Sequence, residues 1–154
     1  MTNYRRLRVA GGTYFFTVNL ANRGSTTLTD HIEALREAVR VTRSERPFGI
    51  DAAVVLPDHL HMIWTLPGGD ADFSTRWRLI KSRFSMAVGV HAPRTGSQSA
   101  KGERGVWQRR FWEHVIRDEA DYEAHVRYCR ENPVKHGFVE RAEDWPWSSV
   151  HWVG

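Results

Sequence analysis

Short runs of β-branched and aromatic residues recur along the chain and predict four strands. The expected strands cover residues 13–20, 48–56, 59–66 and 111–116. Turn-forming residues separate them, with two glycines before the first strand, Pro57 and Asp58 between the second and the third, and a Pro-Gly-Gly-Asp stretch after the third. The second and third strands are therefore joined by a tight connection.

Apolar positions three and four residues apart predict three helices, over residues 29–44, 75–88 and 118–131. Their candidate N-terminal caps are, in chain order, Thr29 or Asp30, Asp72 or Ser74, and Asp118 or Glu119. We expect Asn132 and Pro133 to end the third helix, because the residue before a proline disfavours the helical region.

The order strand, helix, strand, strand, helix, strand, helix predicts an α+β fold. Its economical packing is a ferredoxin-like antiparallel sheet with helices on one face. Residues 89–106 are basic and rich in Gly, Ser and Ala, which is typical of a flexible loop. Too little chain follows for a second core, so we expect one domain over residues 1–154.

Composition adds limits to this picture. Hydrophobic residues make up 41% of the 154 residues and charged residues 26%, as in an ordinary folded protein. The single cysteine, Cys129, excludes a disulfide framework and a cysteine-rich zinc site. No apolar run approaches about 18 residues and no secretory signal opens the chain, so we expect a cytoplasmic protein without a membrane partner.

The 22 Lys and Arg residues outnumber 18 Asp and Glu, and the excess is clustered. The candidate DNA-binding residues are Arg5, Arg6, Arg8, Arg76, Arg78, Lys81, Arg83, Arg109 and Arg110. Trp77, Trp107, Phe111 and Trp112 lie among them. Cations that meet phosphates beside rings that stack on bases suit a nucleic-acid groove. The alternative is a solvated basic surface with the tryptophans in the core.

His59 and His61 flank Leu60 inside the third predicted strand. Residues i and i+2 of a strand point to the same face, so both imidazoles leave the sheet side by side. Paired imidazoles can hold a divalent metal. From the spacing alone, two polar residues on an open sheet face is an equally good interpretation.

The third predicted helix carries Tyr128 and Asn132 on one face, with His125 near it. A tyrosine can attack a phosphodiester, and an asparagine oxygen suits a hard cation such as Mg²⁺ or Mn²⁺. A buried ring and a helix cap are the structural alternatives for these two residues.

Four motifs occur together in order along the chain: residues 57–64 (PDHLHMIW), 107–117 (WQRRFWEHVIR), 128–137 (YCRENPVKHG) and 145–149 (WPWSS). Together with residues 11–19, they resemble the REP-associated tyrosine transposases. This family is related to the single-tyrosine HUH transposases of small insertion sequences. The resemblance covers nearly the whole chain and implies an HUH endonuclease fold.

The resemblance implies that His59 and His61 hold one Mg²⁺ or Mn²⁺, that Asn132 completes the metal site, and that Tyr128 is the nucleophile. The implied substrate is single-stranded or hairpin DNA at repetitive extragenic palindromes (REP), cleaved through a 5′-phosphotyrosine intermediate. A free tyrosine has a pKa of about 10, so the metal or a neighbouring base such as His125 must activate it. Cys129 and Arg130 depart from the residues usual at these positions in the family.

Two other functions stay open. A non-catalytic DNA-binding protein derived from a transposase would keep only the groove. A histidine-based nucleotide phosphodiesterase would use the His pair directly, although Ile63 stands where its third alternating histidine is expected. The chain is expected to act as a monomer or a homodimer.

Overall fold

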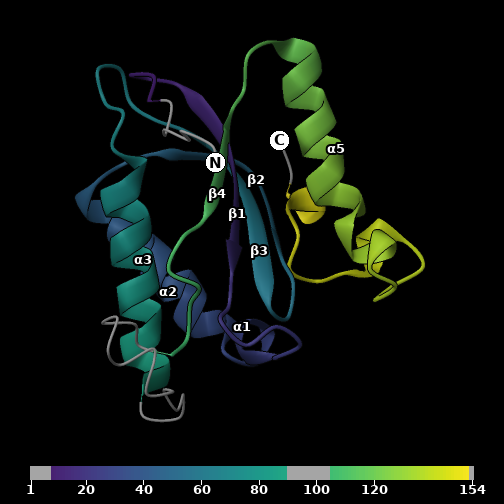
Figure 1. Ribbon diagram of the computed structural model, residues 1–154. Coiled ribbons are helices and arrows are strands. Elements are labelled where there is room, and N and C mark those ends of the chain that lie inside the picture. The colour runs from purple at the N-terminus through teal and green to yellow at the C-terminus, as the bar shows by residue number, and fades with distance from the viewer. Residues whose placement is uncertain (1–7, 90–104, 153–154) are drawn as a thin grey trace, which may run out of the picture.

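The computed structural model describes residues 8–89 and 105–152. Its strands are β1 (Thr13–Asn19), β2 (Gly49–Val55), β3 (His59–Thr65) and β4 (Trp112–Val115). Its helices are α1 (Thr27–Asp30), α2 (Ile32–Glu45), α3 (Phe73–Val88) and α5 (Glu119–Lys135), followed by the 3-10 turns η2 (Ala142–Asp144) and η3 (Ser149–His151). The strands pair antiparallel in the order β2-β3-β1-β4 (Figure 1). The predicted α+β class and antiparallel sheet are confirmed.

The helices cover both faces of this sheet (Figure 1). On one face, α2 and α3 pack on a core that includes Phe16 and Leu60. On the other face, residues of α5 pack on a second cluster that includes Phe15 and Ile63. The expectation of helices on one face is wrong in this respect, because β1 and β3 carry apolar side chains on both faces and each face needs a cover.

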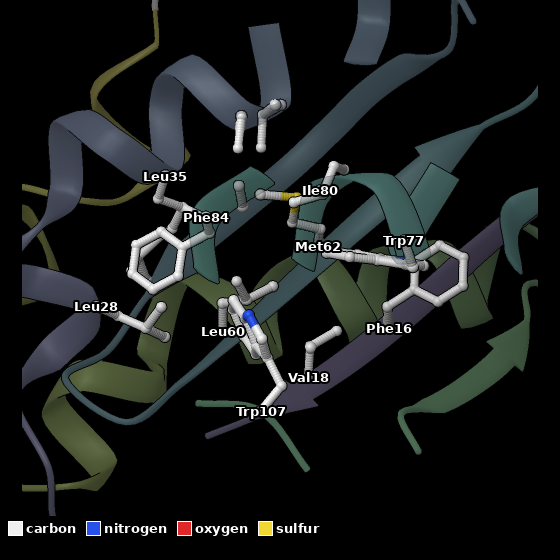
Figure 2. Packing of buried hydrophobic residues seen from close by; sticks show 14 of the residues in the cluster. Phe16, Val18, Leu28, Leu35, Leu60, Met62, Trp77, Ile80, Phe84 and Trp107 are labelled. Atoms are coloured by element: carbon white, nitrogen blue, oxygen red, sulfur yellow. The ribbon is translucent and has the colours of Figure 1, made fainter. Parts of the chain in front are cut away.

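The larger core combines aliphatic side chains with several aromatic rings (Figure 2). Trp77 of α3 stacks on Trp64 of β3 with centroids 4.4 Å apart, and Phe16 meets both at an angle. Trp107 is also buried there and its indole N–H donates to the carbonyl of Lys81 at 3.0 Å. Two tryptophans expected as stacking platforms are thus core residues, whereas Trp112 is 56% exposed.

The observed helix ends agree only in part with those expected from the sequence. Asp72 caps α3 by accepting from the Thr75 N–H, and Asp118 caps α5 in the same way. The first expected helix is divided at His31 into α1 and α2. The third does not end at Pro133 but continues to Lys135, with the proline inside its last turn. The buried neighbours Cys129 and Asn132 keep that turn packed against the sheet.

The segment after α5 returns to the edge strand β2. The Val55 N–H donates to the Trp147 carbonyl at 2.9 Å, and the Ala53 N–H donates to Ser149 Oγ at 3.0 Å. The Trp145 indole donates back to the Val55 carbonyl at 2.8 Å. These bonds satisfy backbone groups that an open sheet edge would leave exposed.

Some of the residues singled out from the sequence lie outside the ranges that the structure describes. Arg5, Arg6 and most of the expected loop 89–106 lie outside the described residues. Val106, at the end of that expected loop, is described and buried. Among the described residues, no helix combines the length and apolarity needed to cross a membrane.

Candidate active site

His59 and His61 lie on β3, one of the two inner strands, on the sheet face that α5 covers. Their partners across the ladder on β1 are Asn19 and Thr17, respectively. Leu60 between them belongs to the opposite core. The two imidazole centroids are 5.0 Å apart, so the predicted side-by-side arrangement is confirmed.

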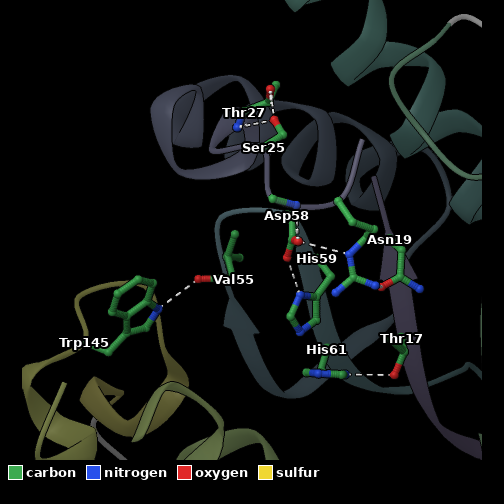
Figure 3. A network of polar contacts seen from close by, with 11 residues as sticks. Thr17, Asn19, Ser25, Thr27, Val55, Asp58, His59, His61 and Trp145 are labelled. Atoms are coloured by element: carbon green, nitrogen blue, oxygen red, sulfur yellow. Dashed lines mark hydrogen bonds and ion pairs between the residues drawn. The ribbon is translucent and has the colours of Figure 1, made fainter. Parts of the chain in front are cut away.

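Each imidazole is oriented by a hydrogen bond at its Nδ1 (Figure 3). His59 Nδ1 lies 2.7 Å from Asp58 Oδ1, and His61 Nδ1 lies 2.8 Å from Thr17 Oγ1. With Nδ1–H donating in both cases, each Nε2 keeps a lone pair for a ligand. Sequence reasoning missed Thr17 and Asp58 as positioning residues, although Asp58 stands directly before the pair.

Asp58 is itself fixed from the loop after β1. Arg23 Nε donates to Asp58 Oδ2 at 3.0 Å, and the Gly24 N–H donates to the same oxygen at 2.8 Å. Burial alone would raise the pKa of Asp58, but the hydrogen bonds from Gly24, His59 and Arg23 outweigh it and hold this pKa well below its usual range. The carboxylate stays charged and keeps His59 in one orientation.

Both imidazoles are held neutral near pH 7. Burial is the largest cause that lowers the pKa of His61 to about 3, and the positive charges of Lys135 and Arg23 add to it. Burial also lowers the pKa of His59, with Asp58 opposing the shift. Neutral imidazole is the form that binds metal.

Helix α5 brings Tyr128 beside the His pair, and Asn132 follows on the same helix face. The Tyr128 ring lies 5.1 Å from the His61 ring, meets Phe15 edge-on, and is 38% exposed. Asn132, one turn later, is only 1% exposed. Among the described residues, four buried side-chain atoms lack a hydrogen-bond partner, and three of them are His61 Nε2, Asn132 Oδ1 and Asn132 Nδ2.

Asn132 lies one helical turn from both Tyr128 and His136, whose rings contact those of His61 and His59. Unpartnered buried groups each cost on the order of 1–3 kcal/mol, so their presence here indicates a site for a further ligand. Two imidazole nitrogens and one amide oxygen fit a divalent cation with open positions for further ligands.

Comparison with known proteins identifies two similar relatives. The chain is 50% identical over 151 residues to the REP-associated tyrosine transposase of Escherichia coli K12, covering 98% of this chain and 84% of that protein. It is 43% identical over 152 residues to a relative of the same description from Haemophilus influenzae, covering 98% and 86%. No family model matches the chain.

The chain belongs to the REP-associated tyrosine transposases. A solved REP-associated tyrosine transposase bound to a REP hairpin superposes with a TM-score of 0.84 at 50% identity, covering 98% of this chain and 84% of that one. A protein described as a transposase from Deinococcus radiodurans shares the fold, with a TM-score of 0.54 at 15% identity over 86% of this chain and 97% of its own. A transposase-like role in DNA binding follows from this membership.

Two further residues border the His pair. Lys135 Nζ lies 5.3 Å from the centroid of the Tyr128 ring, and the His136 ring lies 5.3 Å from that of His59. Both are exposed. Sequence reasoning gave them no role, although they belong to the motif of residues 128–137.

His125 lies at one edge of the site and has its own partners. Its Nδ1 is 2.8 Å from the Asp121 carbonyl, and its ring stacks on His114 at 4.6 Å. His114, Asp121 and His125 together form a group that could hold a metal ion. His114 already bonds the Asp121 carboxylate at 2.9 Å.

Tyr122, the other tyrosine of α5, is engaged elsewhere. Its hydroxyl donates to Asp51 Oδ2 at 2.9 Å. Burial and this carboxylate raise the pKa of Tyr122 to about 12, which makes it a poor nucleophile.

The basic residues of α3 lie on the sheet face opposite the His pair and are mostly committed to the fold. Arg76 is 3% exposed, pairs with Asp70 at 2.8 Å and donates to the carbonyls of Arg46, Pro47 and Asp72. The prediction that Arg76 contacts DNA phosphate is wrong, because its guanidinium is enclosed by these partners.

The other candidates differ in accessibility. Arg83 bonds Thr42 and Glu45, and Lys81 Nζ donates to the Gln108 carbonyl at 2.9 Å. Arg78, Arg109 and Arg110 are exposed. Arg8 is exposed as well, with its guanidinium 5.2 Å from the Phe73 ring. Of the DNA-binding candidates in the described residues, these exposed four are the ones still available.

Proposed function

We propose that this protein is a metal-dependent, single-strand DNA endonuclease and strand transferase acting on REP hairpins. The observation that supports the proposal is the contact between the Tyr128 and His61 rings, with the buried, unpartnered amide of Asn132 one helical turn after Tyr128. The family membership supports a transposase, and the bound REP hairpin of the solved relative supports the substrate.

In the proposed reaction, Tyr128 Oη attacks the scissile phosphorus and the bond from phosphorus to O3′ breaks. The products are a 5′-phosphotyrosine and a free 3′-OH. A bound Mg²⁺ or Mn²⁺ would polarise the phosphate and stabilise its developing charge. Because the phosphodiester energy is kept in the phosphotyrosine, attack by a 3′-OH restores the strand.

The chain's own residues position and activate this reaction. His59, His61 and Asn132 would hold the metal, and Asp58 and Thr17 keep the imidazoles in the binding tautomer. His125 is a candidate acceptor for the phenolic proton, since its Nδ1 is occupied by the Asp121 carbonyl and its Nε2 can act as a base. The proton needed by O3′ would come from solvent.

The decisive experiment is detection of the covalent intermediate. We expect the wild-type protein, incubated with Mn²⁺ and a labelled REP hairpin carrying a single-stranded flank, to form an adduct stable to denaturing electrophoresis. Tyr128→Phe should abolish the adduct and leave hairpin affinity nearly unchanged, because only the nucleophilic oxygen is removed. Tyr122→Phe is the matched control and should form the adduct.

A second set of measurements tests the assignment of the metal ligands. EDTA, His59→Ala and His61→Ala should each remove cleavage, because a hard-cation site with few ligands loses its ion when one is deleted. Hairpin binding without any adduct in the wild type would instead favour the non-catalytic DNA-binding protein. Adduct formation in EDTA at the wild-type rate would overturn the metal mechanism.

A further inference from the structure

Outside the His pair, three side chains with metal-binding atoms lie together where β4 leads into α5 (Figure 1). His114 belongs to β4, whereas Asp121 and His125 lie one turn apart on α5. The candidate ligand atoms all lie within 4.8 Å of one another. The side chains are 25%, 15% and 24% exposed, respectively, so they are sheltered from bulk water yet accessible to an ion.

The separations of these atoms are close to those of ligands around one ion. Asp121 Oδ2 lies 2.9 Å from His114 Nε2, and Asp121 Oδ1 lies 3.1 Å from His125 Nδ1. Ligand atoms that are each about 2.1 Å from a metal stand about 3.0–3.4 Å from one another. Small rotations of the three side chains would therefore place these atoms around an ion.

The carboxylate in this group is held from the turn before α5. The Arg117 N–H donates to Asp121 Oδ2 at 3.0 Å, and the Asp121 N–H donates to Asp118 Oδ1 at 2.8 Å. Such outer hydrogen bonds orient the ligands of protein metal sites. The Arg117 guanidinium approaches the same carboxylate at 3.9 Å, but this side chain is 77% exposed and can turn into solvent when an ion binds.

Two imidazoles and one carboxylate favour a transition metal. Such nitrogen and oxygen ligands bind Zn²⁺ more tightly than Mn²⁺. The group is separate from the His pair, because the ring of Phe15 lies between them. The centroid of this ring is 4.7 Å from that of His125 and 5.4 Å from that of His61. The two sites would therefore be neighbours with different metal preferences.

We propose that His114, Asp121 and His125 form a second metal site, which binds Zn²⁺ and opposes cleavage. The ion would join β4 to the first two turns of α5, the part of the helix that precedes Tyr128. It replaces the hydrogen bonds between the two rings and Asp121, and each neutral ring keeps one proton. With the metal on His125 Nδ1, that proton is on Nε2, which can then no longer accept the phenolic proton. This last consequence rests on the proposed function.

Zn²⁺ binding is measured by calorimetry on the full-length protein without DNA, in the His61→Ala background so that the His pair does not contribute. We expect Zn²⁺ to bind and to raise the melting temperature, because an ion that binds only the folded state stabilises it. Adding His114→Gln should weaken binding at least about tenfold, since even an outer partner of a metal ligand contributes that much. Adding His31→Gln, at an exposed histidine elsewhere, is the matched control and should leave the affinity unchanged.

Co²⁺ identifies the side chains that hold the ion. It accepts the same ligands as Zn²⁺ and absorbs visible light when bound to them, so we expect this absorption in His61→Ala. The absorption should disappear when either His125→Gln or Asp121→Asn is added, whereas His31→Gln should keep it. Thermal unfolding in EDTA identifies any variant that fails to fold, and the remaining variants then decide the assignment.

A separate measurement follows the covalent adduct. With Mn²⁺ and the labelled hairpin, added Zn²⁺ should inhibit adduct formation by the wild-type protein. The Zn²⁺ concentration that gives half inhibition should rise at least about tenfold in His114→Gln, because this change weakens the second site and keeps the His pair.

The outcomes distinguish this inference from the proposed function. Equal Zn²⁺ affinity with and without His114→Gln in the His61→Ala background overturns the second site. Binding that depends on His114, combined with the same half-inhibiting concentration in the wild type and His114→Gln, overturns the effect on cleavage. Absence of any adduct in the wild type with Mn²⁺ alone contradicts the proposed function, whereas the binding measurements without DNA still decide the metal site.

Discussion

His61 is surrounded by groups that favour its neutral form. It is 3% exposed, and its Nδ1 is fixed by Thr17 while its Nε2 has no partner among the described residues. An imidazole in this state is ready for a metal but is an unfavourable place for a proton. The same arrangement has consequences for stability.

We expect the free energy of unfolding to fall as the pH is lowered from 6.5 to 5. The pKa of His61 is about 3 in the folded protein and about 6.5 in the unfolded chain, so only the unfolded chain takes up the proton in this range. The expected loss by pH 5 is roughly 1–2 kcal/mol from this group. Urea unfolding at each pH, in EDTA, measures it. His61→Gln should flatten the dependence, and an unchanged slope would contradict the neutral buried state.

The buried side chain of Asn132 is expected to lower stability in the absence of a metal. Its amide is buried with both polar atoms unpartnered, so the metal-free protein carries a desolvation penalty there. We expect Asn132→Leu to raise the free energy of unfolding in EDTA by about 1 kcal/mol while abolishing Mn²⁺ binding. Denaturant melts and Mn²⁺ titration give the two values. A loss of stability in the variant would show that the amide has structural partners.

Helices α3 and α5 have different roles although both carry charged residues. The exposed side of α5 carries Tyr128 and faces solvent beside the His pair, whereas α3 buries Arg76 together with its apolar stripe. The Arg76 guanidinium joins the start of α3, the turn after α2 and Asp70. It is therefore a structural link between elements.

Replacing Arg76 should consequently affect stability rather than DNA binding. We expect Arg76→Met to lower the free energy of unfolding by roughly 2–4 kcal/mol, because Asp70 and three carbonyls lose their donor. The exposed neighbour provides the control, and Arg78→Ala should change stability by less than about 0.5 kcal/mol. Thermal unfolding compares the two variants. If Arg76→Met keeps wild-type stability and weakens hairpin binding, the side chain is available to DNA after all.

The whole molecule divides its tasks between the two faces of one sheet. The face under α2 and α3 holds the large aromatic core, and the face under α5 holds a smaller apolar cluster beside the His pair and Tyr128. The segment from Trp145 to Ser149 then closes the edge at β2 through backbone and side-chain bonds. The candidate site thus lies on the less heavily packed face, with its scaffold fixed from the other side.

Shortening the chain after Asp144 should test this closure. We expect a lower melting temperature and concentration-dependent self-association, because the edge of β2 would be exposed and Trp145 would no longer pack on the second cluster. Circular dichroism melts and light scattering measure the two effects. Trp152→Ala, which removes a side chain that is 54% exposed, is the control and should behave like the wild type.

The sequence by itself determined the strands, the common sheet face of the two imidazoles and the family. These follow from local rules, since side chains alternate along a strand and linked motifs keep their spacing. It also placed Tyr128 and Asn132 on one helix face, because four residues make about one turn. The sequence could not show that Arg76 is a structural residue, since a basic cluster does not reveal whether a given cation binds phosphate or buried carbonyl groups. Nor could it place α5 on the opposite face of the sheet, continue that helix through Pro133, or bring Lys135 over Tyr128. Those outcomes depend on which surfaces need burial and which charges meet across the fold, and only the tertiary structure decides them.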